Sequence, residues 1–336
     1  MSAGLDLLDE RSVIGYLLGR GVAVGEDATA RELGGGISNV VLSIDWVDQR
    51  VIVKQSLPQL KVEYEWFAPV ERVLREARSI ELMNSLLPGA APRLLDADAD
   101  RFVIAMTGAP ANWTDWKQRL MVGDVRRSVG SLLGTDLARM HSMTRGGADL
   151  DQSFFDELPF DQLRIDPYFR HAARRLPQLG AAILETVEEL RARRSCLVHG
   201  DFSPKNLLVD PSQQTVWFID FEVANFGDPA FDLAFLLTHL ALKAVHHPQD
   251  ALELDATGEC FVTAYAFAIG PASTVDLAHV IRLVGCLLAA RVEGKSQAEY
   301  LDSPQRATAL ALATAILADR PGTLADLTLA RIQGAP

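Results

Sequence analysis

Two short stretches in the middle of the chain place polar side chains at the ends of apolar runs. In residues 197–209, Asp201 precedes Asn206 by five positions, and in residues 216–222, Asp220 directly follows an apolar run. Each run is typical of a short strand. A phosphoryl-transfer site needs such a set: a carboxylate that accepts the proton of the attacking hydroxyl, and an amide oxygen and a second carboxylate that hold Mg²⁺ over the phosphates. The spacing therefore predicts Asp201 as the catalytic base, with Asn206 and Asp220 as metal ligands.

This part of the chain resembles the aminoglycoside phosphotransferase and choline kinase family, the small-molecule relatives of protein kinases. The family's catalytic loop is similar to His199-Gly-Asp-Phe-Ser-Pro-Lys-Asn206, its metal-binding segment to Ile219-Asp-Phe-Glu222, and the following turn and helix start to Gly227-Asp-Pro-Ala-Phe-Asp-Leu-Ala234. The resemblance implies a two-lobed, protein-kinase-like α+β fold. A small N-lobe with an antiparallel sheet is expected at residues 1–107, and a larger, mainly helical C-lobe at residues 108–336. It also implies Mg²⁺ as cofactor and ATP or GTP as co-substrate.

A glycine-rich stretch near the N-terminus is a candidate phosphate-binding loop. Gly34, Gly35 and Gly36 lie between two strand-like runs, where a backbone without Cβ atoms can turn tightly and present N–H groups to an anion. Ser38 adds a hydroxyl donor. Taken alone, the stretch is typical of an ordinary hairpin. The next strand, however, ends in Lys54 and has the form of the kinase strand whose lysine binds the α- and β-phosphates, so we expect this loop and Lys54 to bind the nucleotide.

A helix at residues 68–87 is expected to supply the carboxylate that fixes Lys54. Val73 and Ile80 belong to its apolar stripe, and Glu76 flanks that stripe. The string around Glu76 resembles the family's helix with the partner glutamate, which favours Glu76, whereas Glu81 lies nearer the centre of the stripe and is the alternative. The arginines of the same helix are interpreted as a solvated face: Arg72, Arg75 and Arg78.

The strand at residues 101–106 is expected to end at the connection between the lobes. By resemblance, the backbone of Met106 to Gly108 faces the adenine edge. The family often has an acidic residue at this strand end, and Met106-Thr107-Gly108 departs from that pattern, so the choice between ATP and GTP stays open. His199 and Asp232 are expected to brace the catalytic loop.

The sequence leaves the phosphate acceptor open. The turn-rich, acidic residues 146–170 are interpreted as an insertion beside the substrate cleft, and helices are expected at about 230–246, 255–269, 273–293 and 304–319. Glu222 is a candidate to meet a substrate cation or a second metal ion. Residues 54–58 are similar to methylthioribose kinases, which favours an amino sugar, an aminoglycoside or another sugar; choline and homoserine are the alternative acceptors. Lys205 stands where the family commonly has glycine, and it either touches the triphosphate or faces solvent.

Composition narrows the classes of partner. The net charge of −12 argues against nucleic acid and against an anionic membrane surface, since both require a basic footprint. The N-terminus lacks a basic region followed by an apolar core, and no apolar segment is long enough to span a bilayer. We therefore expect a cytoplasmic protein with a small-molecule partner, and the sequence does not determine its oligomeric state.

The motif residues are compatible with three classes of protein. A small-molecule kinase is favoured because Lys54, Asp201, Asn206 and Asp220 are all present. A nucleotide-binding regulatory module without catalysis is the alternative. A protein kinase is disfavoured because no activation segment is evident between Asp220 and Asp232.

Overall fold

The protein is described by a computed structural model that covers residues 6–34, 38–61, 66–270, 275–319 and 322–324. The chain divides into two compact units. The first contains residues 1–113 and 217–223, and the second contains residues 114–216 and 224–336. The expected division into lobes at residue 107 stays a prediction.

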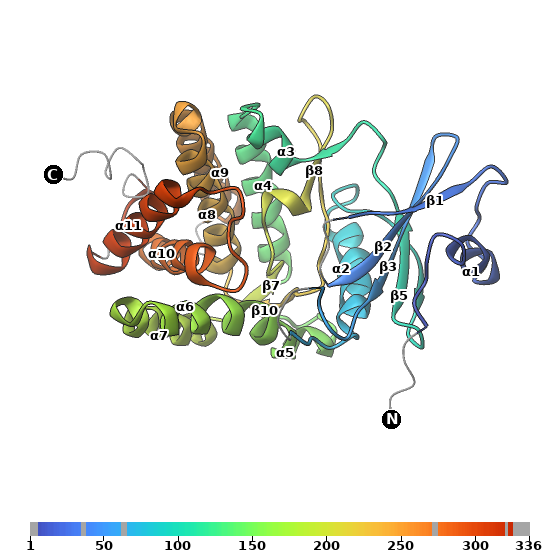
Figure 1. Ribbon diagram of the computed structural model, residues 1–336, viewed down its shortest axis with the longest axis horizontal. Helices are drawn as coiled ribbons and strands as arrows, with labels where there is room; N and C mark the ends of the chain where they lie inside the picture. Colours follow the sequence, from blue (N-terminus) through green and yellow to red (C-terminus); the bar gives the residue numbers. More distant parts are fainter. Residues whose placement is uncertain (1–5, 35–37, 62–65, 271–274, 320–321, 325–336) are drawn as a thin grey trace. The chain divides into compact units, whose positions relative to one another are not determined.

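A five-stranded antiparallel sheet forms the centre of the first unit (Figure 1). Successive residues of a strand point to opposite faces, so Val53 and Lys54 on the third strand face opposite sides of the sheet. The strands follow the spatial order β1-β2-β3-β5-β4, with bounds β1 (Thr29–Glu32), β2 (Asn39–Trp46), β3 (Gln49–Ser56), β4 (Leu94–Asp98) and β5 (Val103–Thr107).

Helices cover both faces of this sheet. The short helix α1 (Val13–Gly19) packs Val13 and Leu17 into the apolar core that contains Val53. Helix α2 (Arg72–Leu86) packs on β3, β4 and β5, and Lys54 reaches its Glu76, so α2 covers the opposite face. The buried apolar residues of α2 recur at helical spacing: Val73, Ala77, Ile80 and Met83.

A short segment from the middle of the chain also belongs to the first unit. This segment comprises residues 217–223 and begins inside the strand β9 (Val216–Phe218). The backbone N–H of Phe218 donates to the carbonyl of Ala90 at 2.8 Å, and the rings of Trp113 and Trp217 lie 5.3 Å apart. These contacts attach the predicted metal segment to the first unit.

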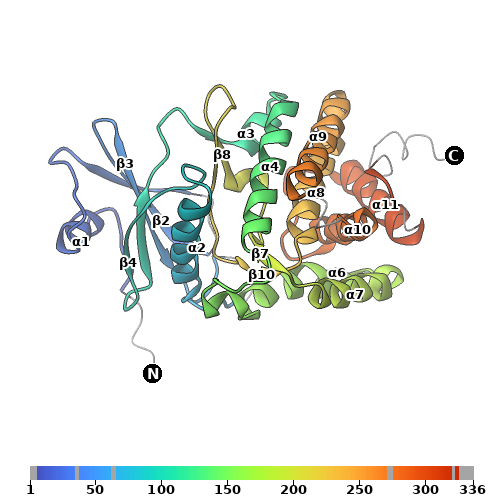
Figure 2. The same cartoon turned by 180° about the vertical axis from the view of Figure 1, so that it is seen from behind.

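The second unit is mainly helical. Helices α4 and α9 lie side by side in both views (Figures 1 and 2). They approach most closely at Gly134, where an added Cβ atom would lie 2.2 Å from the carbonyl oxygen of Phe261. The helices are α3 (Trp116–Met121), α4 (Arg127–Met143), α5 (Leu158–Phe160), α6 (His171–Arg175), α7 (Pro177–Ala192), α8 (Ala230–His246), α9 (Ala251–Ile269), α10 (Leu277–Glu293) and α11 (Ser303–Asp319). A π-helical stretch, Asp161–Arg170, joins α5 to α6. The expected C-terminal helices are therefore present, although α9 begins four residues earlier than the sequence indicates.

Two small antiparallel pairs frame the predicted catalytic loop in the second unit. Strand β7 (Cys196–Val198) pairs with β10 (Asn225–Gly227), and β6 (Thr114–Asp115) pairs with β8 (Leu207–Val209). The loop runs from β7 through a short 3₁₀ turn, Pro204–Asn206, into β8. In the described part of the chain, no helix combines the length and the apolar character that crossing a membrane requires.

Candidate functional site

The residues of the first unit that the sequence predicts to bind the nucleotide gather around one lysine. The ammonium group of Lys54 lies 2.7 Å from Oε1 of Glu76 and 2.8 Å from Oδ1 of Asp220. Glu76 is fully buried, whereas Glu81 is exposed, so α2 presents Glu76 to the lysine. Asp220 has a φ of 69°, a left-handed conformation that is uncommon for a non-glycine residue and often marks a functional site.

The protonation states of this group follow from burial and neighbouring charge. Burial by itself lowers the pKa of Lys54, but the carboxylates of Asp220 and Glu76 overcome that effect and raise it. Burial raises the pKa of Glu76 to about 7 against the opposing effect of Lys54. The Oε2 atom of Glu76 is buried without a hydrogen-bond partner among the described residues. Lys54 is therefore a permanent cation between two carboxylates.

Glu222 is held inside the first unit by polar side chains. Its Oε1 accepts a hydrogen bond from the Ser38 hydroxyl at 2.8 Å, and its Oε2 accepts one from Nδ2 of Asn39 at 3.0 Å. Its Oε2 also lies 3.1 Å from Nε of Arg72, and Glu222 is 7% exposed. The Ser38 hydroxyl, expected to serve a phosphate, thus donates to a carboxylate, and Glu222 has an internal cationic partner.

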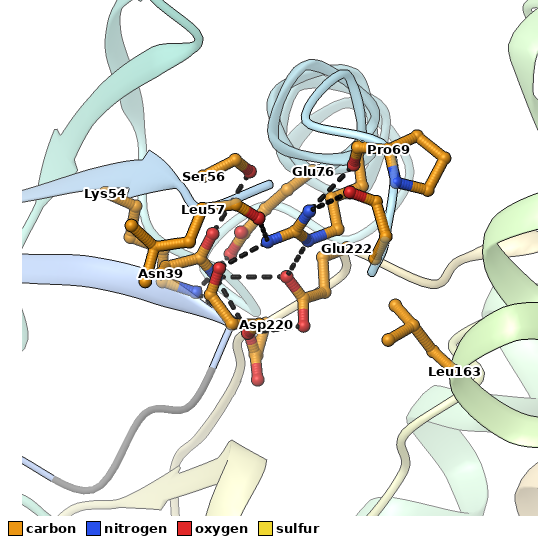
Figure 3. Close-up of polar contacts among 12 residues, drawn as sticks. Asn39, Lys54, Ser56, Leu57, Pro69, Glu76, Leu163, Asp220 and Glu222 are labelled. Atoms are coloured by element: carbon orange, nitrogen blue, oxygen red, sulfur yellow. Dashed lines mark hydrogen bonds and ion pairs between the residues drawn. The ribbon is translucent and has the colours of Figure 1, made fainter. Parts of the chain in front are cut away.

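Arg72 connects four segments of the first unit, and three of the residues that it contacts, Leu57, Pro69 and Glu222, are labelled in Figure 3. Besides Glu222, its guanidinium donates to the backbone carbonyls of Ala68, Pro69, Leu57 and Ser38. The interpretation of Arg72 and Arg75 as a solvated face is wrong, because they are only 1% and 4% exposed, whereas Arg78 is exposed. Residues four apart on a helix share a face, so Arg72 lies directly before Glu76 on the buried side.

The glycine loop and the strand end are described only in part. Gly34 lies in the described chain, whereas Gly35 and Gly36 fall outside the described residues. Met106 pairs with strands on both of its sides. The N–H groups of Thr107 and Gly108 donate to the carbonyls of Arg93 and Arg50 at 2.9 and 2.8 Å. The donors of this stretch are therefore used within the sheet.

The catalytic-loop residues of the second unit form a cluster of their own. Asp201 is 5% exposed. Its Oδ2 lies 2.9 Å from the guanidinium of Arg164 and 3.2 Å from the ammonium of Lys205. Nε of Arg164 also donates to the carbonyl of Gly200 at 2.7 Å, so this arginine holds both the backbone and the carboxylate of the loop. Sequence reasoning missed Arg164, because no motif marks it.

Hydrogen bonds inside the loop set the orientation of Asn206. Its amide nitrogen donates to the carbonyl of Asp201 at 2.9 Å, so the amide oxygen is the atom available to a cation. The backbone N–H of Asp201 faces Nδ1 of His199 at 3.2 Å. Asp232 accepts hydrogen bonds from the backbone N–H groups of His199 and Gly200 at 2.6 and 2.9 Å. The side chains of His199 and Asp232 thus brace the loop.

Three acidic residues of the expected insertion lie beside cations of the same unit. Asp161 lies 2.8 Å from Arg170, and Glu157 lies 3.0 Å from Arg191. Asp166 lies 3.5 Å from Arg174 and 3.7 Å from Lys295.

Within the described ranges, no group of three or more His, Cys, Asp and Glu side chains is arranged to hold a metal ion.

The sequence and the fold of this chain are similar to those of known phosphotransferases. The model of the phosphotransferase enzyme family matches residues 29–266. A methylthioribose kinase from Geobacillus sp. (strain WCH70) is 23% identical over 72% of this chain and 68% of its own length. A choline kinase structure from Streptococcus pneumoniae has a TM-score of 0.55 at 16% identity, covering 92% of this chain and 99% of that chain. An amicoumacin kinase solved with AMP-PNP and Ca²⁺ has a TM-score of 0.59 at 15% identity, covering 96% and 98%.

The two solved structures confirm the predicted protein-kinase-like α+β fold, since they cover nearly the whole chain. The family match spans well over half of the chain and confirms the predicted class of small-molecule phosphotransferases. The chain belongs to the phosphotransferase enzyme family.

Proposed function

We propose that this protein transfers the γ-phosphoryl group of ATP to a hydroxyl of a small molecule. Asp201 accepts a hydrogen bond from the attacking hydroxyl and takes its proton. Its carboxylate need not be strongly basic, because positioning carries most of the catalysis in phosphoryl transfer. Lys54, held by Glu76, binds the phosphates, and the glycine loop that contains Gly34 and ends near Ser38 covers them.

Asn206 and Asp220 are the proposed ligands of Mg²⁺. They offer an amide oxygen and a carboxylate, and oxygen donors of this kind suit Mg²⁺, which usually keeps several waters and takes the remaining ligands from substrate phosphates. When bound, the ion neutralises the charge that develops on the phosphates. Because the backbone of Asp201 accepts from Nδ2 of Asn206, the chain itself selects the amide oxygen as the donor.

The observation that carries this proposal is the ion pairing of Lys54 with both Glu76 and Asp220. A structural ion pair needs one carboxylate. Protein kinases pair a strand lysine with a helix glutamate and use a second carboxylate to hold Mg²⁺, and here both carboxylates lie beside Lys54. Family membership supports the same reaction class.

We also propose a cytoplasmic location.

The test is ATP consumption with a panel of hydroxyl acceptors and Mg²⁺, comparing the wild type with Asp201→Asn. We expect kcat to fall by orders of magnitude in the variant, while the Kd of the Mg²⁺–nucleotide complex stays nearly unchanged. The isosteric amide keeps the shape of the loop but cannot take the proton. Tight nucleotide binding by the wild type without turnover of any hydroxyl compound would instead identify a regulatory module.

A further inference from the structure

Three cations of the second unit have no carboxylate partner in the described part of the chain. They are Lys117 on α3, Lys243 on α8 and Arg291 on α10, and no acidic oxygen of a described residue lies within 4 Å of any of them. The chain carries a net charge of −12, so its acidic residues outnumber its basic ones. Many other cations of the chain are paired, as Arg127 is with Glu253 at 2.7 Å.

Two of these cations, Lys117 and Lys243, lie near the same aromatic ring. The ammonium groups of Lys117 and Lys243 lie 5.8 and 5.6 Å from the centre of the Tyr300 ring. Lys243 is only 1% exposed, and its hydrogen bond, to the carbonyl of His239 in its own helix, is 3.5 Å long. Burial of a charged group without a partner is costly, so Lys243 either gives up its proton or keeps it with an anion bound beside it.

Donor groups beside the cations also lack partners. Nε of Arg291 and the hydroxyl of Tyr300 are both buried, and neither has a hydrogen-bond partner among the described residues. Nη1 of Arg291 donates to the backbone carbonyl and to the hydroxyl of Ser296, in the loop after α10. Buried polar atoms are normally satisfied, so these two donors indicate an acceptor that the chain does not supply.

The pKa shifts of nearby titratable groups indicate a positive electrostatic potential. Burial lowers the pKa of Lys243 to about 7, and Lys117 and Arg291 lower it further, while Asp115 opposes them weakly. His239 has a pKa well below its ordinary value because of burial and the same cations. Burial by itself raises the pKa of Tyr168, yet Arg291 and Arg164 bring it below its usual range.

A continuous set of contacts links this cluster to the catalytic loop within the second unit. Arg164, which contacts Asp201, lies over the rings of Tyr168 and Phe235 at 5.6 and 5.7 Å. Phe235 in turn lies 5.3 Å from His239. Phe235, His239 and Lys243 recur every four residues and therefore form one stripe of α8 that leads from the loop to the cations.

We propose that Lys117, Lys243, Arg291 and the hydroxyl of Tyr300 form an anion-binding subsite for the phosphate acceptor, which is a hydroxyl compound that carries a carboxylate or a phosphate. This inference rests on the proposed kinase function. It replaces the amino-sugar and choline-type acceptors considered from the sequence, because the acids of residues 157–166 are neutralised by arginines and the cations beside Tyr300 are not.

Binding of inorganic phosphate tests the subsite directly. The protein is first saturated with Mg²⁺ and AMP-PNP, so that the nucleotide phosphate sites are filled, and thermal stability is followed against phosphate, with chloride at equal ionic strength as control. We expect a saturable rise in Tm. In Lys243→Met and Arg291→Gln the Kd for phosphate should increase by roughly 10- to 100-fold, as expected for the loss of one charged hydrogen bond. Arg127→Gln, which removes an equal charge outside the cluster, should behave as the wild type.

A second measurement compares acceptors that share one ring: glucose, glucosamine, glucuronate and glucose 6-phosphate. Turnover that favours glucuronate or glucose 6-phosphate supports the subsite, and the preferred member distinguishes carboxylate from phosphate. Preference for glucosamine or glucose would overturn it while leaving the kinase function intact. Phosphate that competes with AMP-PNP, or that binds all variants equally, would also overturn it. Saturable phosphate binding in a protein without kinase activity would retain the subsite and reject the proposed function.

Discussion

The Nε atom of Arg72 lies 3.1 Å from Oε2 of Glu222, and both side chains are buried. The two residues are separated by 150 positions in the chain. Through this pair, the start of α2 is bonded to the segment that contains Asp220. The same guanidinium binds the backbone of Ser38 and Leu57, so one side chain fixes the end of the glycine loop and the strand that carries Lys54.

Replacing Arg72 with methionine should destabilise the first unit strongly. Glu222 would keep its charge in a buried site without a cation, and loss of one partner of a buried pair costs about 3–5 kcal/mol. Urea denaturation of Arg72→Met measures this, with Arg78→Met, an exposed arginine of the same helix, as the control expected near zero. The double variant Arg72→Met/Glu222→Met should recover part of the loss; equal stability of the single and double variants would show that the pair is not coupled.

Lys54→Met should weaken nucleotide use. The substitution removes the cation between Glu76 and Asp220, so the two carboxylates are left without their shared counter-charge. We expect kcat/KM for ATP to fall on the order of 100-fold or more, since electrostatic stabilisation is the main catalytic contribution. Steady-state kinetics against Lys61→Met, whose exposed lysine pairs with Glu32, gives the comparison. Equal loss in both variants would mean that Lys54 has no special role.

Arg164 is expected to act as a positioning residue for Asp201. Its two contacts, to the carboxylate of Asp201 and to the carbonyl of Gly200, hold the loop in one conformation. Arg164→Gln should therefore lower kcat by about 10- to 100-fold, with KM for ATP nearly unchanged because the nucleotide-binding residues are not altered. Arg164→Lys should restore part of kcat. A change confined to KM for ATP would assign Arg164 to nucleotide binding instead.

Stability should depend on pH through Lys243. Its pKa is about 7 in the folded protein against 10.5 for an ordinary lysine, so between these values the unfolded state holds the proton that the folded state has lost. Stability from this group therefore rises with pH, by at most about 1.4 kcal/mol per pH unit. Denaturation from pH 7 to 9.5 should show Lys243→Met more stable than the wild type near pH 7, with the gap closing as pH increases. A constant gap would contradict the lowered pKa.

Much of the site was predictable because its residues lie in local patterns. Lys54 follows an apolar run in a strand, Glu76 lies beside the apolar stripe of a helix, and Asp201 and Asn206 share one loop. Local pattern failed at Arg72, which resembles any charged residue on a helix surface until the segments that its guanidinium binds are brought together. Local pattern also gives no sign of the internal partners of Glu222, which come from the N-terminal part of the chain.

The sequence by itself indicated the reaction family and the antiparallel sheet with its helical partner unit, through the resemblance of its motifs to those of a known family. It also indicated the residues of the catalytic motifs, because motif spacing is a property of neighbouring residues. Only the tertiary structure decided that Glu76 rather than Glu81 meets Lys54, that Arg72 binds Glu222, and that Arg164 holds Asp201. It also decided the gathering of Lys117, Lys243 and Arg291 near Tyr300. Each of these pairings joins side chains from separate elements, and charge at such positions takes its meaning from burial and from the partners that folding supplies.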